Sequence, residues 1–144
     1  MKKQIIAFGI LLLMLLTIVG CASAPATTAP NTAPVASNSA LPQEVSVQEG
    51  AKLRDAGAFV LDVREPSEWN EFHIPGSTLI SLGQLQSRVS EIPKDKQVLV
   101  VCRSGNRSRT GRDILKQAGF ANVTSMNGGL TEWRNSGLPT VSGP

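Results

Sequence analysis

The chain has 144 residues, with 14 Lys or Arg against 11 Asp or Glu, and 41% of its residues are hydrophobic. Its formal net charge of +3 falls to +1 without Lys2 and Lys3, which lie in a segment that we expect to be removed. A nearly neutral chain lacks the extended basic face of a nucleic-acid-binding protein, so this class of function is excluded.

Residues 1–20 are typical of a bacterial lipoprotein signal peptide. Two lysines precede the apolar run Ile5–Val19, whose fifteen residues are fewer than the ~20 that a transmembrane helix needs. The sequence Ile18-Val-Gly-Cys21 resembles the lipobox, which implies cleavage before Cys21 and lipid attachment to its thiol. We therefore expect an extracytoplasmic protein that is anchored to the cell membrane or outer membrane. The alternatives are an ordinary signal peptide cut elsewhere, for instance after Ala24, or an uncleaved anchor.

Residues 21–42 begin with the lipidated Cys21 and continue with mostly Ala, Ser, Thr, Pro and Asn, without a charged side chain. Such a segment cannot bury enough apolar surface to offset the entropy cost of ordering it. It therefore predicts a disordered tether that leads to a folded domain at residues 43–141.

Residues 43–141 alternate short strand patterns with short helix patterns, which is typical of an α/β fold with a mainly parallel sheet. The predicted strands are Glu44–Ser46, Phe59–Asp62, Thr78–Ile80, Gln97–Val101 and Asn122–Ser125. The predicted helices begin at the capping box Ser46–Glu49, at Pro66, at a capping Ser81, after Asn106 and at Leu130.

The stretch around Cys102 combines a buried strand, a tight turn and the start of a helix. Cys102 follows the apolar run Val98–Val101. The chain continues as Ser104, Gly105 and Asn106, and both Asn and Gly tolerate left-handed backbone. This geometry turns backbone N–H groups inward and adds the positive end of a helix dipole. The loop is therefore expected to bind a small anion.

Four of the eight arginines of the chain lie within ten positions here, namely Arg103, Arg107, Arg109 and Arg112. Acidic side chains are usually favoured at a helix N-terminus, yet the nearest ones along the chain are Asp95 and Asp113. A broken local preference indicates function, and this positive charge is expected to favour the thiolate form of Cys102. The alternative is a buried, inert cysteine beside a solvated basic surface.

Three motifs resemble the rhodanese (thiosulfate sulfurtransferase) family. The sequence Cys102-Arg-Ser-Gly-Asn-Arg-Ser108 is similar to the active loop of that family. A second stretch is similar to the first signature of the family, namely Leu61-Asp-Val-Arg-Glu-Pro-Ser-Glu-Trp69 followed by His73-Ile-Pro-Gly76. A third is similar to the closing signature of the family, namely Asn127-Gly-Gly-Leu-Thr-Glu-Trp133 followed by Gly137-Leu-Pro139. The motifs occur in the family's order and cover about residues 43–141. The resemblance implies a rhodanese-like α/β fold, a five-stranded, mainly parallel sheet flanked by helices.

The resemblance also implies that Cys102 is the catalytic nucleophile. The loop residues that would bind the substrate are Arg103, Ser104, Gly105, Asn106, Arg107 and Ser108. Asp62 and Arg64 lie where a predicted parallel strand ends, at the edge where such sheets bind ligands, and are expected to support the site. Alternatively, both side chains hold this corner by hydrogen bonds and never meet the substrate, which is the interpretation we favour.

His73 is the only histidine of the chain and lies in a predicted turn, where its ring can satisfy local backbone groups. We expect a structural role for it rather than a part in a Cys–His catalytic pair. The family usually has glycine before this histidine, and Phe72 stands there instead, which leaves the local turn open. Trp69 and Trp133 are expected in the core.

The sequence predicts a sulfurtransferase without a cofactor or metal ion. Cys102 would take a sulfane sulfur from an anionic donor such as thiosulfate and pass it, as a persulfide, to a thiol or cyanide. The related phosphatase and arsenate-reducing loop needs an arginine six positions after the cysteine, and Ser108 stands there between Arg107 and Arg109. A non-catalytic or redox-sensing binding module is the other alternative. Apart from Cys21, one cysteine and one histidine are too few for a zinc site.

Overall fold

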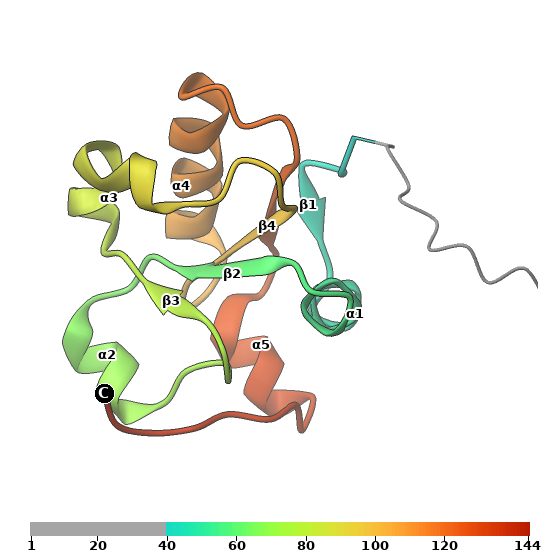
Figure 1. Ribbon diagram of the computed structural model, residues 1–144. Coiled ribbons are helices and arrows are strands. Elements are labelled where there is room, and N and C mark those ends of the chain that lie inside the picture. The colour runs from blue at the N-terminus through green and yellow to red at the C-terminus, as the bar shows by residue number, and fades with distance from the viewer. Residues whose placement is uncertain (1–39) are drawn as a thin grey trace, which may run out of the picture. The chain divides into compact units, whose positions relative to one another are not determined.

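Five strands form one sheet in the part of the chain that the computed structural model describes, residues 40–144 (Figure 1). They are β1 (Glu44–Val45), β2 (Phe59–Asp62), β3 (Thr78–Leu79), β4 (Val98–Val101) and β5 (Val123–Met126). Their order across the sheet is β1-β5-β4-β2-β3, and every neighbouring pair is parallel. The predicted five-stranded parallel sheet is confirmed. The predicted signal peptide and most of the predicted tether, with Cys21, lie outside the described residues.

Within residues 40–144, five α-helices and one 3-10 turn connect the strands. They are α1 (Val47–Asp55), α2 (Pro66–Glu71), α3 (Leu82–Arg88), η1 (Val89–Glu91), α4 (Asn106–Gln117) and α5 (Gly129–Asn135). The predicted capping box opens α1, because the Glu49 amide donates to the Ser46 hydroxyl at 3.3 Å and the Ser46 amide donates to the Glu49 carboxylate at 3.0 Å. None of these helices is both long and apolar enough to cross a membrane.

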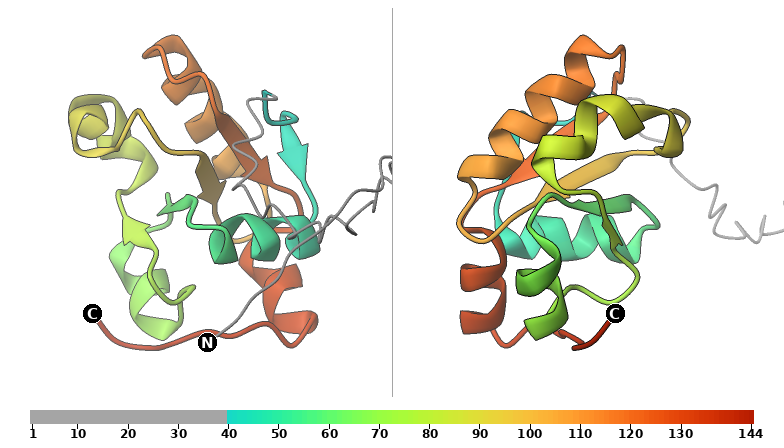
Figure 2. Two further views of the ribbon diagram at one scale, coloured as in Figure 1. Left: turned by 45° about the vertical axis from the view of Figure 1, so that its right-hand side comes forward. Right: turned by 90° about the vertical axis from the view of Figure 1, so that its left-hand side faces the viewer.

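Each face of the sheet carries a hydrophobic core, and successive side chains of β4 alternate between the two. Val98 and Val100 belong to the cluster that packs against α3 and α4, whereas Leu99 and Val101 belong to the cluster that packs against α1 and α5. All four side chains are fully buried, as expected for a central strand of a parallel sheet. Helices α3 and α4 therefore cover one face, and α1 and α5 cover the other (Figure 2).

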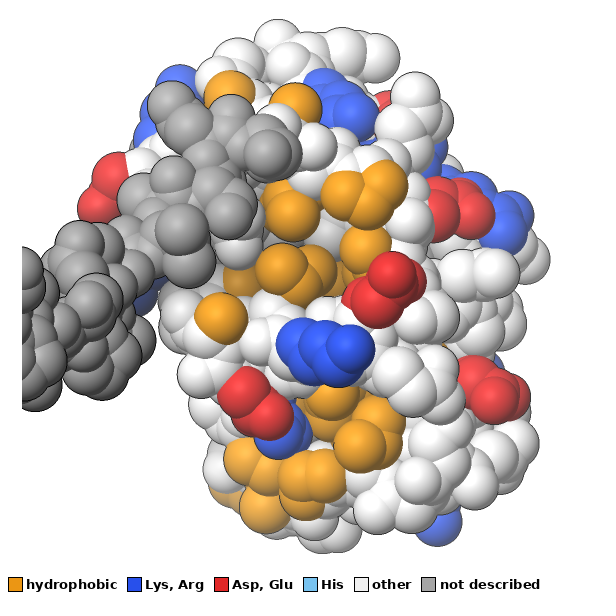
Figure 3. Space-filling view, turned by 90° about the vertical axis from the view of Figure 1, so that its right-hand side faces the viewer, with side chains coloured by type: hydrophobic (Ala, Val, Ile, Leu, Met, Phe, Trp, Pro, Cys, Tyr) orange, Lys and Arg blue, Asp and Glu red, His pale blue; other side chains and the backbone are white. Residues whose placement is uncertain are grey.

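Nearly all large hydrophobic side chains of the described residues are buried or half-buried. Figure 3 shows the face that carries β1 and α1, on which hydrophobic side chains lie in groups separated by charged ones. Val141 is the one large hydrophobic residue of the described part that is exposed, at 43%. The fold is therefore stabilised mainly by apolar burial on the two faces of the sheet.

The topology brings two predicted site segments to one edge of the sheet. In the pairing of β2 with β4, Asp62 lies opposite Val101, the residue before Cys102. Because the two strands run in the same direction, their carboxyl ends lie side by side, at the edge where parallel sheets bind ligands. Asp62 and Cys102 therefore lie at the same edge of the sheet, as predicted.

Two side chains differ from their predicted roles. Ser81 precedes α3 as expected, but its hydroxyl donates to the Arg64 carbonyl oxygen at 3.0 Å instead of capping the helix. Trp69 is half-buried rather than in the core, and its ring stacks on His73 with 3.7 Å between the ring centroids. His73 has the predicted structural role, with its Nδ1 3.2 Å from the Trp69 carbonyl oxygen. Trp133 is fully buried, as predicted.

Candidate active site

Cys102 lies directly after β4 at the bottom of a tight loop, and only 1% of it is exposed. The Gly105 amide donates a hydrogen bond to its Sγ at 3.2 Å. The Ser108 hydroxyl oxygen lies 3.7 Å from the same sulfur and donates to the Gly105 carbonyl oxygen at 2.8 Å. The sulfur therefore accepts a hydrogen bond from the Gly105 amide, while the Ser108 hydroxyl oxygen can accept the thiol hydrogen of Cys102.

Gly105 provides the left-handed turn that the sequence predicted. Its φ is +103°, a conformation that L side chains rarely adopt, and α4 begins at the next residue, Asn106. This turn aims the Gly105 amide at Sγ, and it also places the positive end of the twelve-residue helix α4 at the loop. Both effects favour negative charge on the Cys102 sulfur or on a sulfur bound to it.

Three of the four arginines around the loop pair with acids, and two of these acids lie far away in the sequence. Arg107 binds the Glu68 carboxylate through two hydrogen bonds of 2.7 and 2.8 Å. Arg109 pairs with Glu44, and the Arg112 guanidinium lies 2.9 Å from the Asp113 carboxylate. Arg103 is exposed and makes no ion pair among the residues that the structure describes. Ion pairs therefore balance the charge of three of the four arginines, and Arg103 supplies most of the positive charge that remains beside Cys102.

The Arg107–Glu68 pair remains ionised far below neutral pH. The hydrogen bonds from Arg107 lower the pKa of the Glu68 carboxyl to about 2, and partial burial opposes this shift only in part. Because Glu68 lies on α2 and Arg107 on the first turn of α4, the pair joins the helix after β2 to the loop after β4. Arg107 therefore stabilises the packing of α2 against the loop. Direct contact between its guanidinium and the substrate remains a prediction.

Asp62 and Arg64 form a buried ion pair at the corner after β2, with side chains 0% and 1% exposed. Arg64 Nη2 lies 2.7 Å from Asp62 Oδ2, and its Nε donates to both carboxylate oxygens at 3.0 and 2.9 Å. The remaining guanidinium hydrogens reach the carbonyl oxygens of Glu68, at 3.2 Å, and Phe72, at 2.8 Å. This geometry agrees with the interpretation that both side chains hold the corner, and their wider role in supporting the site remains a prediction.

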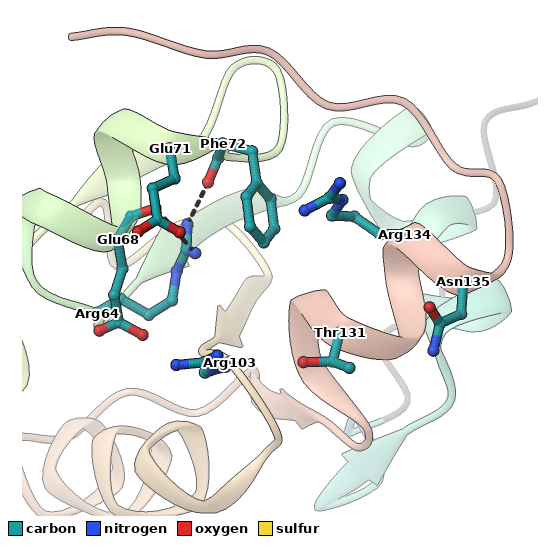
Figure 4. Close-up of a pocket in the computed structure, with 8 residues that line it drawn as sticks. All are labelled: Arg64, Glu68, Glu71, Phe72, Arg103, Thr131, Arg134 and Asn135. Carbon is teal, nitrogen blue, oxygen red and sulfur yellow. Dashed lines mark hydrogen bonds between the residues drawn. The ribbon is translucent and has the colours of Figure 1, made fainter.

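A hollow of about 440 Å³ lies between α2, α5 and the Cys102 loop. Its lining residues are Arg64, Glu68, Glu71, Phe72, Arg103, Thr131, Arg134 and Asn135 (Figure 4). We call it the α2–α5 hollow. It includes one predicted loop residue, Arg103, and one predicted supporting residue, Arg64.

Backbone hydrogen bonds hold the first turn of α5 against Cys102 and Arg103. The Leu130 amide donates to the Cys102 carbonyl oxygen at 2.8 Å, and the Thr131 amide donates to the Arg103 carbonyl oxygen at 3.0 Å. Gly129 permits this approach, because a Cβ atom at this position would lie 2.3 Å from the Cys102 carbonyl oxygen. The side chains of α5 therefore keep a defined position relative to Sγ.

Several residues of the site were missed by reasoning from the sequence. Glu68 lies within the first signature motif, but nothing along the chain indicates that it pairs with Arg107. Phe72, which stands where the motif usually has glycine, has extended backbone with φ −170° and ψ 150°, which any residue adopts. Its ring lies in the hollow (Figure 4). Thr131 lies within the closing motif and Arg134 directly follows it, but nothing along the chain indicates that they lie beside the loop, because only the tertiary fold brings α5 there.

The sixth position after Cys102 holds Ser108, whose side chain is buried within the loop. A bidentate clamp on a tetrahedral oxyanion needs a guanidinium there. The arginines on either side of Ser108 are already paired: Arg107 binds Glu68, and Arg109 binds Glu44. The loop therefore suits a single sulfur atom better than a phosphate or arsenate group.

Comparison with known proteins agrees with this geometry. The sequence pattern of the rhodanese-like domain matches residues 46–136. The chain is 37% identical over 84 residues to a sulfurtransferase of Allochromatium vinosum, which covers 58% of this chain and 78% of the relative. It is 32% identical over 94 residues to the thiosulfate sulfurtransferase GlpE of Pseudomonas syringae, which covers 65% of this chain and 89% of the relative.

A solved structure, that of a rhodanese-related protein from Thermoplasma volcanium, has a TM-score of 0.65 and 31% identity to this chain. The match covers 69% of this chain and 98% of that structure. The pattern match, the relatives and the shared parallel sheet show that the chain belongs to the rhodanese-like domain family.

Proposed function

We propose that the protein is a sulfurtransferase that carries a sulfane sulfur on Cys102. Family membership and the sulfurtransferase relatives support sulfur transfer in general. The observation that carries the proposal is the environment of Sγ, which accepts the Gly105 amide at 3.2 Å inside a closed loop with serine at the sixth position. The Gly105 amide and the N-terminus of α4 would stabilise a further sulfur atom that bears negative charge.

The first half-reaction loads the enzyme. The Cys102 thiolate attacks the outer sulfur of thiosulfate, the S–S bond of the donor breaks, and sulfite leaves with the bonding electron pair. The product Cys102–S–S⁻ carries its charge on the outer sulfur, where loop amides and the N-terminus of α4 stabilise it as an oxyanion hole stabilises an oxyanion. An anionic donor is favoured because the exposed Arg103, which lacks an acidic partner among the described residues, lies beside the loop.

The second half-reaction unloads the enzyme. A nucleophile, a thiolate or cyanide, attacks the outer sulfur of the persulfide, and the electron pair of the broken S–S bond returns to Cys102 Sγ. Donor and acceptor react in separate steps through a covalent intermediate, so the kinetics are expected to be ping-pong. No cofactor or metal ion takes part in either step.

A non-catalytic or redox-sensing module is the alternative. Cys102 is the one cysteine among the described residues, so a sensor built on it would have no second described thiol to form a disulfide. The two functions differ in the product on Cys102, because a sensor acquires oxygen and a sulfurtransferase acquires sulfur.

The decisive experiment is intact-protein and peptide mass spectrometry after treatment with thiosulfate. The expected result is one added sulfur on the Cys102 peptide, which a thiol removes, with none on Cys102→Ser. An unmodified Cys102, or one modified only by oxygen after peroxide, would contradict the sulfurtransferase proposal.

We also propose that the domain is exported and anchored by a lipid on Cys21, with residues 21–42 as its tether. The proposal depends on the lipobox-like sequence Ile18-Val-Gly-Cys21 and on the apolar run before it. Donor and acceptor would then be small molecules outside the cytoplasm.

A further inference from the structure

Two arginines without acidic partners share the α2–α5 hollow. Of the eight arginines of the described residues, six pair with carboxylates: Arg54, Arg64, Arg88, Arg107, Arg109 and Arg112. The two that make no ion pair within residues 40–144 are Arg103 and Arg134, and both line the hollow. Both side chains are exposed, so their guanidinium hydrogens are available to a ligand that brings negative charge.

The ring of Phe72 holds Arg134 in place. The Arg134 guanidinium carbon lies 4.3 Å from the ring centroid, and that of Arg64 lies 5.1 Å from the same centroid (Figure 4). Arg64 is immobilised by Asp62 and by the Phe72 carbonyl oxygen. Phe72 therefore lies between a fixed guanidinium and one that is free to bind a ligand, and cation–π attraction orients the free one.

The rest of the hollow suits a molecule larger than thiosulfate. A volume of about 440 Å³ falls in the range of pockets that hold organic ligands, whereas thiosulfate has only five heavy atoms. Thr131 and Asn135 add neutral polar groups, and Glu71 adds an acid on the opposite wall. The hollow is therefore suited to an organic anion with several polar groups rather than to a bare inorganic anion.

We propose that Arg134, seated on Phe72, and Arg103 bind the carboxylate of a small organic thiol, the acceptor that takes sulfur from Cys102. This inference rests on the proposed sulfur transfer. The acceptor thiolate attacks the outer sulfur of Cys102–S–S⁻, a new S–S bond forms, the old one breaks, and Cys102 leaves as thiolate. The acceptor departs as its own persulfide, R–S–S⁻, so charge and atoms balance without an external oxidant or reductant.

The place of α5 makes this geometry consistent with the reaction. Thr131 donates its amide to the Arg103 carbonyl oxygen, and Leu130 donates its amide to that of Cys102. Arg134 stands one helical turn further along α5. A thiol whose carboxylate rests on Arg134 is thus held at a defined position relative to the loop, which raises the effective concentration of its sulfur there.

The test measures how fast the loaded enzyme is discharged by thiols of similar size and different charge. The full chain is loaded with thiosulfate, desalted, and mixed with 3-mercaptopropionate, 2-mercaptoethanol or cysteamine, and the loss of sulfur from Cys102 is followed by mass spectrometry. The readout is the ratio of the rate with the carboxylate thiol to the rate with the neutral thiol. Differences in thiol nucleophilicity cancel when this ratio is compared between proteins, and so does any inactive fraction.

The ratio is expected to fall roughly tenfold to hundredfold in Arg134→Ala, because a charge-assisted contact is lost. The ratio should fall less in Phe72→Leu, because leucine keeps the apolar packing and removes only the aromatic ring. Arg134→Lys should give a ratio between those of Arg134→Ala and the wild type, because lysine keeps the positive charge. Arg54→Ala is the matched control, since Arg54 also lies over an aromatic ring, that of Trp133, at 5.2 Å, but does not line the hollow. Its ratio should equal that of the wild type.

A ratio that changes by less than about threefold in Arg134→Ala, or that falls equally in Arg54→Ala, overturns the acceptor site. A cysteamine-to-2-mercaptoethanol ratio that falls as much in Arg134→Ala as the 3-mercaptopropionate ratio does also overturns it, because the effect would then not depend on the carboxylate. If thiosulfate leaves no sulfur on wild-type Cys102, the proposed function itself has failed, and this outcome is distinguished before any thiol is added.

Discussion

The Arg107 guanidinium, five positions after Cys102, makes two hydrogen bonds of 2.7 and 2.8 Å to the Glu68 carboxylate. The two residues are 39 positions apart and belong to helices that follow different strands. The pair keeps the negative charge of Glu68 neutralised beside the α2–α5 hollow. It also leaves Arg103 as the loop cation that is available to an anionic donor.

Glu68→Gln is expected to lower the free energy of unfolding by about 1 kcal/mol at neutral pH, because the pair is bidentate but partly exposed, at 22% and 33%. The pKa of Glu68 in the folded protein is about 2, below its ordinary value of 4.5. A depressed carboxyl pKa stabilises the fold above the unfolded-state value, and this stability is lost as the pH falls from about 4.5 towards 2. Urea unfolding at several pH values measures the difference between the two proteins.

The control for this experiment is Asp95→Asn, which removes an exposed acid without an ion pair among the described residues. It should leave stability nearly unchanged at every pH. A Glu68→Gln protein that differs from wild type equally at pH 7 and pH 2 would show that the ion pair is not the cause.

Arg103→Ala is expected to slow loading by thiosulfate roughly tenfold to hundredfold, because it removes a charge-assisted contact to the donor.

Arg107→Ala should also slow loading by thiosulfate, because the negative charge of Glu68 would no longer be neutralised and would repel the anionic donor. In that case the double variant Arg107→Ala/Glu68→Gln should regain much of the loading rate. Stopped-flow or rapid-quench measurement of sulfite release provides the rates. Failure of the double variant to recover would mean that Arg107 contacts the donor directly.

Cys102→Ser is expected to abolish sulfur transfer while the fold persists. Serine has nearly the size of cysteine and can accept the Gly105 amide in place of Sγ, but its hydroxyl is not a thiolate nucleophile. Circular dichroism and urea unfolding check the fold, and a cyanide assay with thiosulfate checks transfer. Residual transfer well above the uncatalysed rate would refute the assignment of Cys102 as the nucleophile.

Gly129→Ala is expected to unfold or inactivate the domain. A Cβ there would lie 2.3 Å from the Cys102 carbonyl oxygen and 2.6 Å from the Arg103 carbonyl carbon, so backbone at the active loop must move. Gly137→Ala is the matched control, since its φ of +69° is also left-handed but nothing lies within 4 Å of a Cβ. The control should lose about 1 kcal/mol from strain alone and remain active. Thermal unfolding and loading rates compare the two variants.

Cys21→Ser is expected to release the protein from membranes and to leave sulfur transfer by the soluble domain unchanged. Serine cannot receive a thioether-linked lipid, and the tether sequence contains no apolar run that would insert by itself. Incorporation of labelled palmitate and membrane fractionation test this prediction. A wild-type protein that takes up no label, or that begins after Ala24, would contradict the lipid anchor and leave the sulfurtransferase proposal intact.

Local signals in the sequence were sufficient to predict the helices and strands around Cys102, and they indicate this residue as the candidate nucleophile. The strand before Cys102, the capping box at Ser46 and the left-handed turn at Gly105 each depend on residues within a few positions of one another. Backbone preference and short-range hydrogen bonding therefore determine them wherever the chain folds. The three motifs together also indicated the family, which the comparisons confirm.

The charges of the site were determined only by the tertiary structure. Along the chain, the acid nearest to Arg107 and Arg109 is Asp113, but the fold brings Glu68 and Glu44 from 39 and 65 positions away to pair with them. The same packing places Arg134 of α5 on the Phe72 ring, beside Arg103. Electrostatic interaction depends on distance in space, and folding makes that distance unrelated to separation along the chain. The sequence alone therefore indicated Cys102 as the candidate sulfur carrier, and the packing of α2 and α5 against the loop determined which of the nearby cations have no carboxylate partner among the described residues.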